Sequence, residues 1–308
     1  MKLDELLSLL DRSHRRHHFA GTDAFGVVCG LDLEGRLFTV VGGEVVSRVH
    51  PDAIRNFSTR HKYQNPGGDV LWPAPEGTRF GYEYATGAWR VPPSITGARY
   101  LVVEDHPSAC TIEAEIDLIN SAGKGLPCLF KREIRLEPDT TLAVVESITY
   151  LGAASFGKGE FLLAPWSLCQ FDSGAGAEVV FPNLPDSVRD LYDPSDAQRR
   201  VEGTLCRTKT DGAQRYQIAL AAGVDFIEYR YPAAHLTVRR TASLPKGGAF
   251  IDIADAPPNA EPSKEGVRFS VYSDLSGFME IEAVGGCGET LRPQDRLSVE
   301  IRTQFKRG

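Results

Sequence analysis

Residues 110–119 read Cys-Thr-Ile-Glu-Ala-Glu-Ile-Asp-Leu-Ile, so that apolar and acidic side chains alternate along the chain. Successive side chains of a β-strand point to opposite faces of the sheet. Ile112, Ala114, Ile116 and Leu118 would then face a core, while the acidic residues between them face water. This pattern predicts a strand in a sheet that has one buried face and one solvated face.

The same alternation continues on both sides of this stretch. Strands are predicted downstream at residues 129–136 and 141–150, and residues typical of turns separate them at 122–125 and 137–140. By the same criteria we expect further strands at residues 36–41, 44–50, 214–221, 225–231, 236–241, 249–253, 267–272, 277–284 and 296–305.

The fold class follows from this density of strands. No long stretch after residue 60 has the 3.6-residue period of a helix, and 30 glycines and 19 prolines suit frequent turns. Gly42-Gly43 lies between two alternating runs and predicts a hairpin. We therefore predict an all-β protein with one antiparallel domain over residues 21–308, and an exposed Pro-rich loop at 255–266.

The N-terminal segment, residues 1–20, has a different period. Leucines at positions 3, 6, 7 and 10 have helical spacing, which predicts a short amphipathic helix that stops near His14. His14 and His18 are four residues apart, but zinc would need a third ligand, so a solvated basic patch is the preferred interpretation. The acidic residues in the first apolar run do not suit a signal peptide, and no run is long enough to span a membrane. We expect a cytoplasmic protein.

Composition excludes several classes. The net charge of −7 disfavours a general nucleic-acid binder, because phosphate affinity comes largely from Lys and Arg. The six cysteines are scattered through apolar stretches and form no C-x-x-C pair, so buried free thiols are expected. No cluster of Cys and His has the spacing of metal ligands, and we expect neither a metal nor another cofactor.

The first candidate site is the segment from Asn65 to Glu76, Asn-Pro-Gly-Gly-Asp-Val-Leu-Trp-Pro-Ala-Pro-Glu. Its glycines allow tight turns and its prolines stiffen the loop that carries Asn65, Asp69, Trp72 and Glu76. Carboxylate and amide groups can bind sugar hydroxyls, and an aromatic ring can stack on the C–H face of a sugar. The alternative is a tryptophan that only fills a corner of the core.

Two strands supply the other candidates. Trp166 and Gln170 share one strand face with the residue between them, Leu168, and would add a second sugar contact unless Trp166 is core. Glu280 and Glu282 also share a face, where mutual repulsion would raise one pKa and allow acid–base chemistry near neutral pH. The alternative is that this face is only solvated.

These segments resemble parts of galactose-mutarotase-like proteins. Residues 129–152 are similar to the paired central strands of that superfamily, and residues 277–305 to its C-terminal hairpin, with a Leu-x-Pro turn at 291–293. The segment Gly67 to Glu76 is similar to a signature in uncharacterised members. The resemblance spans about residues 25 to 305, and it implies a β-supersandwich of two large antiparallel sheets with a concave sugar-binding face.

The resemblance also implies a role for one glutamate. In mutarotases a Glu on the late strand takes a proton from the anomeric hydroxyl, and histidines protonate the ring oxygen. Glu282 matches this Glu best and Glu280 is the second choice. The histidine positions are not matched, because Pro165-Trp166-Ser167 and Asn65-Pro66-Gly67 stand in their place.

Two functions stay open at this stage. One is an epimerase-like enzyme with a glutamate as general base on a small-molecule sugar, and the other is a non-catalytic saccharide-binding protein; a purely structural sandwich is less favoured. Both require distant segments to meet. We expect convergence on one concave surface of Asn65, Asp69, Trp72, Glu76, Trp166, Gln170, Glu280 and Glu282.

Overall fold

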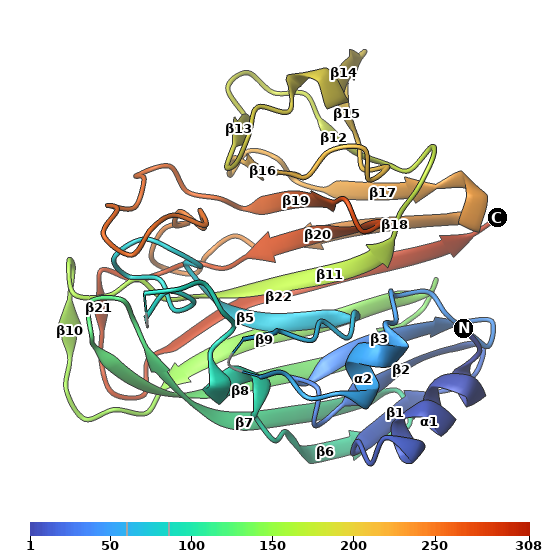
Figure 1. The fold of residues 1–308 in the computed structure, drawn as a ribbon, viewed down its shortest axis with the longest axis horizontal. Coiled ribbons are helices and arrows are strands. Elements are labelled where there is room, and N and C mark those ends of the chain that lie inside the picture. Colours follow the sequence, from blue (N-terminus) through green and yellow to red (C-terminus); the bar gives the residue numbers. More distant parts are fainter. Residues whose placement is uncertain (60, 86) are drawn as a thin grey trace.

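The computed structural model describes residues 1–59, 61–85 and 87–308. Two large antiparallel sheets face each other, and the chain crosses repeatedly between them (Figure 1). This arrangement confirms the predicted all-β, two-sheet antiparallel sandwich with a short N-terminal helix.

The first sheet carries strands from both ends of the chain. Its order is β1-β2-β3-β5-β11-β20-β19-β16-β13, with β4 paired to β3. The bounds are β1 His17–Gly21, β2 Phe25–Gly30, β3 Arg36–Val41, β4 Glu44–Val45, β5 Asp69–Ala74, β11 Ala164–Asp172, β13 Val188–Asp190, β16 Tyr216–Leu220, β19 Phe269–Asp274 and β20 Phe278–Val284.

The second sheet has the order β14-β15-β12-β17-β18-β22-β9-β8-β7-β6. Its strands are β6 Leu101–His106, β7 Ala109–Ile119, β8 Gly125–Glu137, β9 Thr141–Tyr150, β12 Glu178–Pro182, β14 Arg199–Glu202, β15 Leu205–Lys209, β17 Ile227–Tyr231, β18 Leu236–Ala242 and β22 Arg296–Arg307. The remaining elements are the pair β10 Phe156–Gly157 and β21 Thr290–Leu291, the helices α1 Leu3–Arg12, α2 Pro51–Arg55 and α3 Pro93–Thr96, and the 3₁₀ turns η1 Asp196–Gln198 and η2 Pro232–Ala234.

The three central strands predicted from residues 110–150 are confirmed as β7, β8 and β9, which pair in sequence order. Gly42 and Gly43 form the predicted turn, with φ of 60° and 74°. The strand expected at 249–253 is wrong. Apart from one bridge between Ala249 and Cys287 this segment has no strand partner, and it is buried by side-chain packing instead.

Helix α1 covers the outer face of the first sheet near its β1 edge (Figure 1). Its buried leucines pack with Val28, Phe38 and Val40 of that sheet. The helix ends at Arg12, close to the expected stop near His14, and residues 17–20 of the N-terminal segment belong to β1, which hydrogen-bonds to β2. His18 lies 3.1 Å from the Asp105 carboxylate. Within the described residues no group of three or more His, Cys, Asp or Glu side chains could hold a metal ion.

The interior between the sheets is apolar except for one cluster of charges. All six cysteines are buried and free, as predicted. The charged cluster consists of Arg132, Arg240, Asp69 and Glu146, with two positive and two negative side chains that contact one another at 2.5 to 3.0 Å. Charge balance and hydrogen bonds offset the cost of removing these ions from water. No helix in the described chain is long and apolar enough to cross a membrane.

Candidate functional site

The candidate site lies on the face of the first sheet that points away from the second sheet. Strands β5, β11 and β20 are neighbours there, and their register aligns Trp166 with Trp72, and Gln170 with Glu280. Because side chains alternate along each strand, Trp72, Trp166, Glu280 and Glu282 all emerge on this one face. The two-residue spacing seen in the sequence therefore produces a shared surface.

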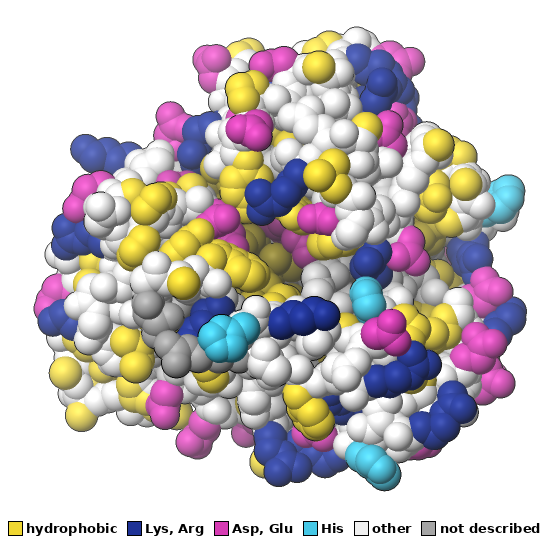
Figure 2. Space-filling view, viewed as in Figure 1, with side chains coloured by type: hydrophobic (Ala, Val, Ile, Leu, Met, Phe, Trp, Pro, Cys, Tyr) yellow, Lys and Arg dark blue, Asp and Glu magenta, His cyan; other side chains and the backbone are white. Residues whose placement is uncertain are grey.

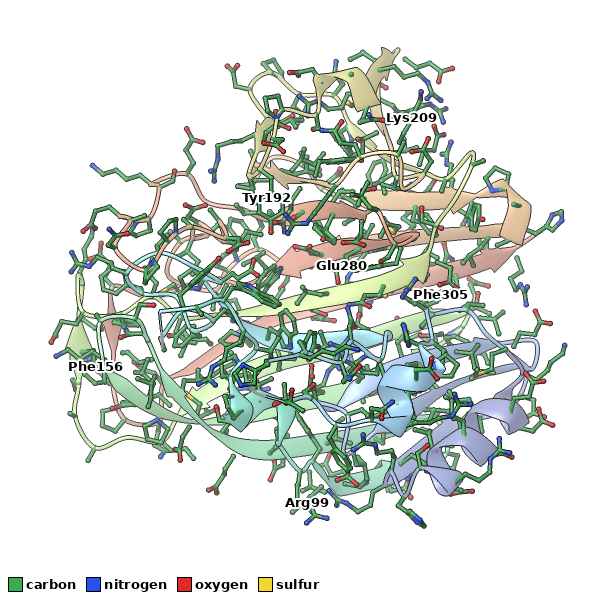
Figure 3. All side chains as sticks on the ribbon, in the orientation of Figure 1. Arg99, Phe156, Tyr192, Lys209, Glu280 and Phe305 are labelled. Atoms are coloured by element: carbon green, nitrogen blue, oxygen red, sulfur yellow. The ribbon has the colours of Figure 1, made fainter. Side chains whose placement is uncertain are left out.

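This surface is hollowed into a cavity of about 380 Å³, at the small end of the range for ligand pockets. Figure 2 shows a hollow near the centre of the same face, with hydrophobic and acidic side chains around it. Figure 3 places Glu280 beside this hollow on β20, with Tyr192 on the far side of it. The lining residues are Tyr63, Asn65, Trp72, Glu76, Tyr84, Trp89, Trp166, Leu168, Tyr192, Arg215, Gln217, Asp255, Tyr272, Phe278, Glu280 and Glu282.

Six of the eight residues expected to converge line this cavity, and two do not. Gln170 lies next to the lining, and its amide Nε2 donates a hydrogen bond to Glu280 Oε1 at 2.6 Å. Asp69 was expected on the concave surface, and that expectation is wrong. It pairs with Cys169 in the register, so its side chain points between the sheets into the charged cluster, where the hydroxyl of Ser167 donates to it at 3.0 Å.

Each of the three tryptophans of the chain lines the cavity, and each is fixed through its indole N–H. The indole of Trp72 donates to Glu34 at 3.2 Å, that of Trp89 to Glu76 at 2.7 Å, and that of Trp166 to Glu282 at 2.9 Å. A bonded indole N–H holds the ring in one plane. The three indole rings therefore form rigid parts of the cavity lining.

Glu282 is the most covered of the lining carboxyl groups. It accepts hydrogen bonds from Trp166 and from the amide of Gln217, the latter at 3.2 Å. Its exposed fraction is 0%. Burial, followed by repulsion from Glu280, raises its pKa well above the ordinary value of a glutamate. Its surroundings therefore favour the protonated form of Glu282.

The pKa values of Glu280 and Glu76 lie closer to neutrality. Burial raises the pKa of Glu280 to about 7, and the Arg36 guanidinium and the Gln170 amide oppose the rise. Burial and the nearby Asp255 carboxylate raise the pKa of Glu76 to about 8. The cavity therefore holds one carboxyl that begins to ionise near pH 7 and another that is still mostly protonated there.

The wall formed by loops and by β16 was missed by sequence reasoning. Asp255 belongs to the loop expected to be exposed, yet it lines the cavity and accepts hydrogen bonds from the hydroxyls of Tyr84 and, at 3.5 Å, Tyr192. Trp89 and Gln217 were not singled out either. The two-residue alternation in 214–221 could have shown which strand face carries Gln217, but no local sequence signal connected that strand with the segments of Trp89 and Asp255.

The cavity has one basic residue among its described lining, Arg215, and no histidine. Arg215 Nε donates to the hydroxyl of Tyr272 at 3.0 Å, and its guanidinium lies 4.4 Å from the ring centroid of Tyr192. Proton transfer in this cavity would therefore involve carboxyl groups rather than imidazoles.

Comparison with solved structures shows the fold. A protein from Synechocystis is similar with a TM-score of 0.60 and 10% identity, over 96% of each chain. A galactose mutarotase-like protein from Lactobacillus casei has a TM-score of 0.56 and 13% identity, over 94% of this chain and 100% of its own. A homologue of aldose epimerase from C. elegans has a TM-score of 0.52 and 11% identity, over 95% and 99%. The sequence itself matches no protein-family model and no curated protein. The chain thus has the galactose mutarotase-like fold expected from the resemblance.

Proposed function

We propose that this chain, on its galactose mutarotase-like fold, is a 1-epimerase-like enzyme that interconverts the anomers of a small sugar. One observation carries the proposal: Glu280 and Glu76, with pKa values of about 7 and about 8, line the same aromatic-walled cavity. A base and an acid with pKa values near the working pH are what proton transfer at both oxygens of the anomeric carbon requires.

The roles of the carboxyl groups follow from their surroundings. The resemblance favoured Glu282 as the base, but a proton acceptor must be accessible and ionised, whereas Glu282 is fully buried and its pKa is raised well above the ordinary value. Glu280 keeps an exposed fraction of 8% and ionises more easily, because Arg36 stabilises its charged form. We assign Glu280 as the general base and Glu282 as the more deeply buried carboxyl group beside it.

The reaction has two proton transfers. Glu280 takes the proton of the anomeric hydroxyl, the C1–O1 bond becomes a carbonyl, and the bond from C1 to the ring oxygen breaks. Glu76 gives its proton to that ring oxygen. Rotation about the C1–C2 bond followed by the reverse steps forms the other anomer, and both carboxyl groups recover their starting state.

The rest of the cavity supports a sugar as the reactant. The fixed faces of Trp72 and Trp166 provide apolar surfaces for the C–H face of a ring. Gln217 has a buried amide oxygen with no hydrogen-bond partner among the described residues, and a sugar hydroxyl would supply one. The volume favours one ring over a longer chain.

The absence of histidine from the described lining favours a second candidate, a protein that binds a saccharide without reaction. The same walls and hydrogen-bonding groups would serve that function. The two candidates differ only in whether anomer exchange accelerates.

The test is exchange between anomers, measured by NMR magnetisation transfer over a panel of neutral and amino aldoses. For the best substrate, Glu280→Gln and Glu76→Gln should each lower the rate by roughly 10²–10⁴ while binding persists. Glu289→Gln, at an exposed side chain outside the cavity, is the matched control and should have no effect. Binding by the wild type without any acceleration would reject the enzyme and leave the binding protein.

A further inference from the structure

Outside the cavity, the buried carboxylates of the described chain are paired with arginines, with the exception of Glu83. Glu34 lies 2.9 Å from Arg36, and Glu146 lies 2.6 Å from Arg132. Asp69 contacts two arginines and Asp252 contacts a third. This pairing follows from the high cost of burying a charge without a partner.

The carboxyl groups of the cavity break this pattern. Within the described chain, no basic nitrogen lies within 4.0 Å of Glu76, Asp255, Glu280 or Glu282. Glu83, which is buried near Glu76, is likewise unpaired. Acidic groups are thus gathered around an open space without a direct ion pair, and Arg36 and Arg215 act on Glu280 and Glu76 only from a distance.

The one basic group of the described lining does not fill that role. Arg215 is an exposed residue, and its guanidinium packs against Tyr192 and hydrogen-bonds to Tyr272 rather than to a carboxylate. It forms no ion pair within the described residues. Arg215 therefore acts on Asp255 and Glu76 through its charge but contacts neither carboxyl group.

The aromatic walls have the geometry of a cage. The rings of Trp89 and Tyr63 are inclined at 75° with centroids 6.5 Å apart, and those of Trp72 and Trp166 at 73° and 6.3 Å. Because the two rings of each pair are nearly perpendicular, their faces point in different directions around the cavity. Ring faces attract cations, and aromatic cages are a common way to bind ammonium groups.

The unpartnered polar atoms of the cavity are acceptors. The side chain of Gln217, which lines the cavity and is only 2% exposed, has an amide oxygen without a hydrogen-bond donor. The buried amide oxygen of Gln170, next to the lining residue Glu280, has no donor either. An occupant must therefore donate hydrogen bonds. Hydroxyl and ammonium groups do so, whereas phosphate and carboxylate groups do not.

We infer that the sugar bound in this cavity carries a positive charge, as an amino sugar whose ammonium group lies against Asp255 and the rings of Tyr84 and Trp89. Asp255 suits this position because its carboxylate accepts hydrogen bonds from two tyrosine hydroxyls and has no ion pair within 4.0 Å among the described residues, although the charge of Arg215 lies near it. Glu280 and Glu76 are left free for proton transfer. The inference rests on the proposed function only in taking a sugar as the occupant.

Titration calorimetry at pH 6.5, where the amine is protonated, tests the inference on the full chain. The probes are sets of three matched hexoses, one with a free amine, one with the amine acetylated and one with a hydroxyl in its place, with the nitrogen at carbon 2, 3, 4 or 6. We expect one free amine to bind at least about tenfold more tightly than both of its neutral partners. Equal or weaker binding of every free amine would overturn the inference.

A pair of variants locates the charge. Asp255→Asn should reduce the preference for the free amine to about twofold or less, because the side chain keeps its shape and loses its charge. Asp193→Asn, at an exposed aspartate one residue from Tyr192, should leave the preference unchanged. A preference that survives Asp255→Asn would overturn the assignment to Asp255. The comparison of matched ligands on the wild type does not depend on either variant folding.

The outcomes separate this inference from the proposed reaction. Preferred binding of a free amine without anomer exchange would support the charged ligand and reject the enzyme. Exchange of neutral sugars with no preference for an amine would do the reverse. Tight binding of a sugar phosphate or a uronic acid in place of an amine would overturn the inference directly.

Discussion

The pH dependence of anomer exchange tests the two assigned carboxyl groups together. Glu280 must be ionised to accept a proton, so activity is lost as the pH falls below its pKa of about 7. Glu76 must be protonated to donate, so activity is lost as the pH rises above its pKa of about 8. The expected profile is a bell with its maximum near pH 7.5.

The width of the bell can be worked out from these two values. With a base of pKa about 7 and an acid of pKa about 8, about 60% of the enzyme is in the active protonation state at pH 7.5. At pH 6 and at pH 9 that share falls to about 9%. The value of kcat/KM should therefore drop about sevenfold on each side of the maximum.

The assay is the rate of anomer exchange from pH 5 to 10 with the uncatalysed rate subtracted at each pH. The residual activity of Glu76→Gln should keep the acid limb and lose the alkaline limb, which assigns that limb to Glu76. A profile that is flat from pH 6 to 9, or an alkaline limb that survives in Glu76→Gln, would refute the assignment. A plateau that extends to pH 10 would mean that another group supplies the proton.

Two predictions concern the scaffold that holds the cavity, and both are read from urea unfolding midpoints. Arg132→Met should lower the free energy of unfolding by about 3–5 kcal/mol, because it leaves a net negative charge between the sheets. Adding Glu146→Leu restores the charge balance and should recover at least about 1 kcal/mol of that loss. A double variant whose loss equals the sum of the two single losses would contradict this. Gly67→Ala should lower the free energy of unfolding by at least about 2 kcal/mol, since the φ of Gly67 is 89° and a Cβ would lie 2.2 Å from the Arg48 carbonyl oxygen. Gly43→Ala is the control: its φ is 74° but the space around it is open, so the loss should be only about 1 kcal/mol. Equal losses would show that the contact with Arg48 does not matter.

Local sequence was sufficient for most of the fold. Alternation in 110–150 predicted β7, β8 and β9 because the two-residue period of a strand is a property of the strand itself, whatever it pairs with. Helix α1 followed from the spacing of its leucines for the same reason. The error at 249–253 arose because an apolar extended segment can be largely buried with only isolated backbone hydrogen bonds, here to Cys287 and Val267. Local residues do not reveal whether a continuous strand ladder forms.

The candidate site could be predicted only in part. Spacing on single strands correctly paired Glu280 with Glu282, and Trp166 with Gln170, on shared faces. The segment that carries Asp69 and Trp72 was interpreted as a loop, whereas it forms β5, where residues three apart point to opposite faces of the sheet. As a carboxylate, Asp69 was expected to contact a ligand, but Arg132 and Arg240 of the second sheet bind it in the interior between the sheets.

The tertiary structure alone decided which carboxyl groups share the cavity and which of them ionise first. Glu76, Asp255 and Glu280 come from segments more than 20 residues apart in every pair, and only the crossing of the chain between two sheets brings them together. Their pKa values depend on burial and on the charges around them, which are sums over neighbours from the whole fold. The sequence determined which faces each strand would present, because side-chain direction is local, whereas the chemistry of the cavity is a property of the assembled sheets.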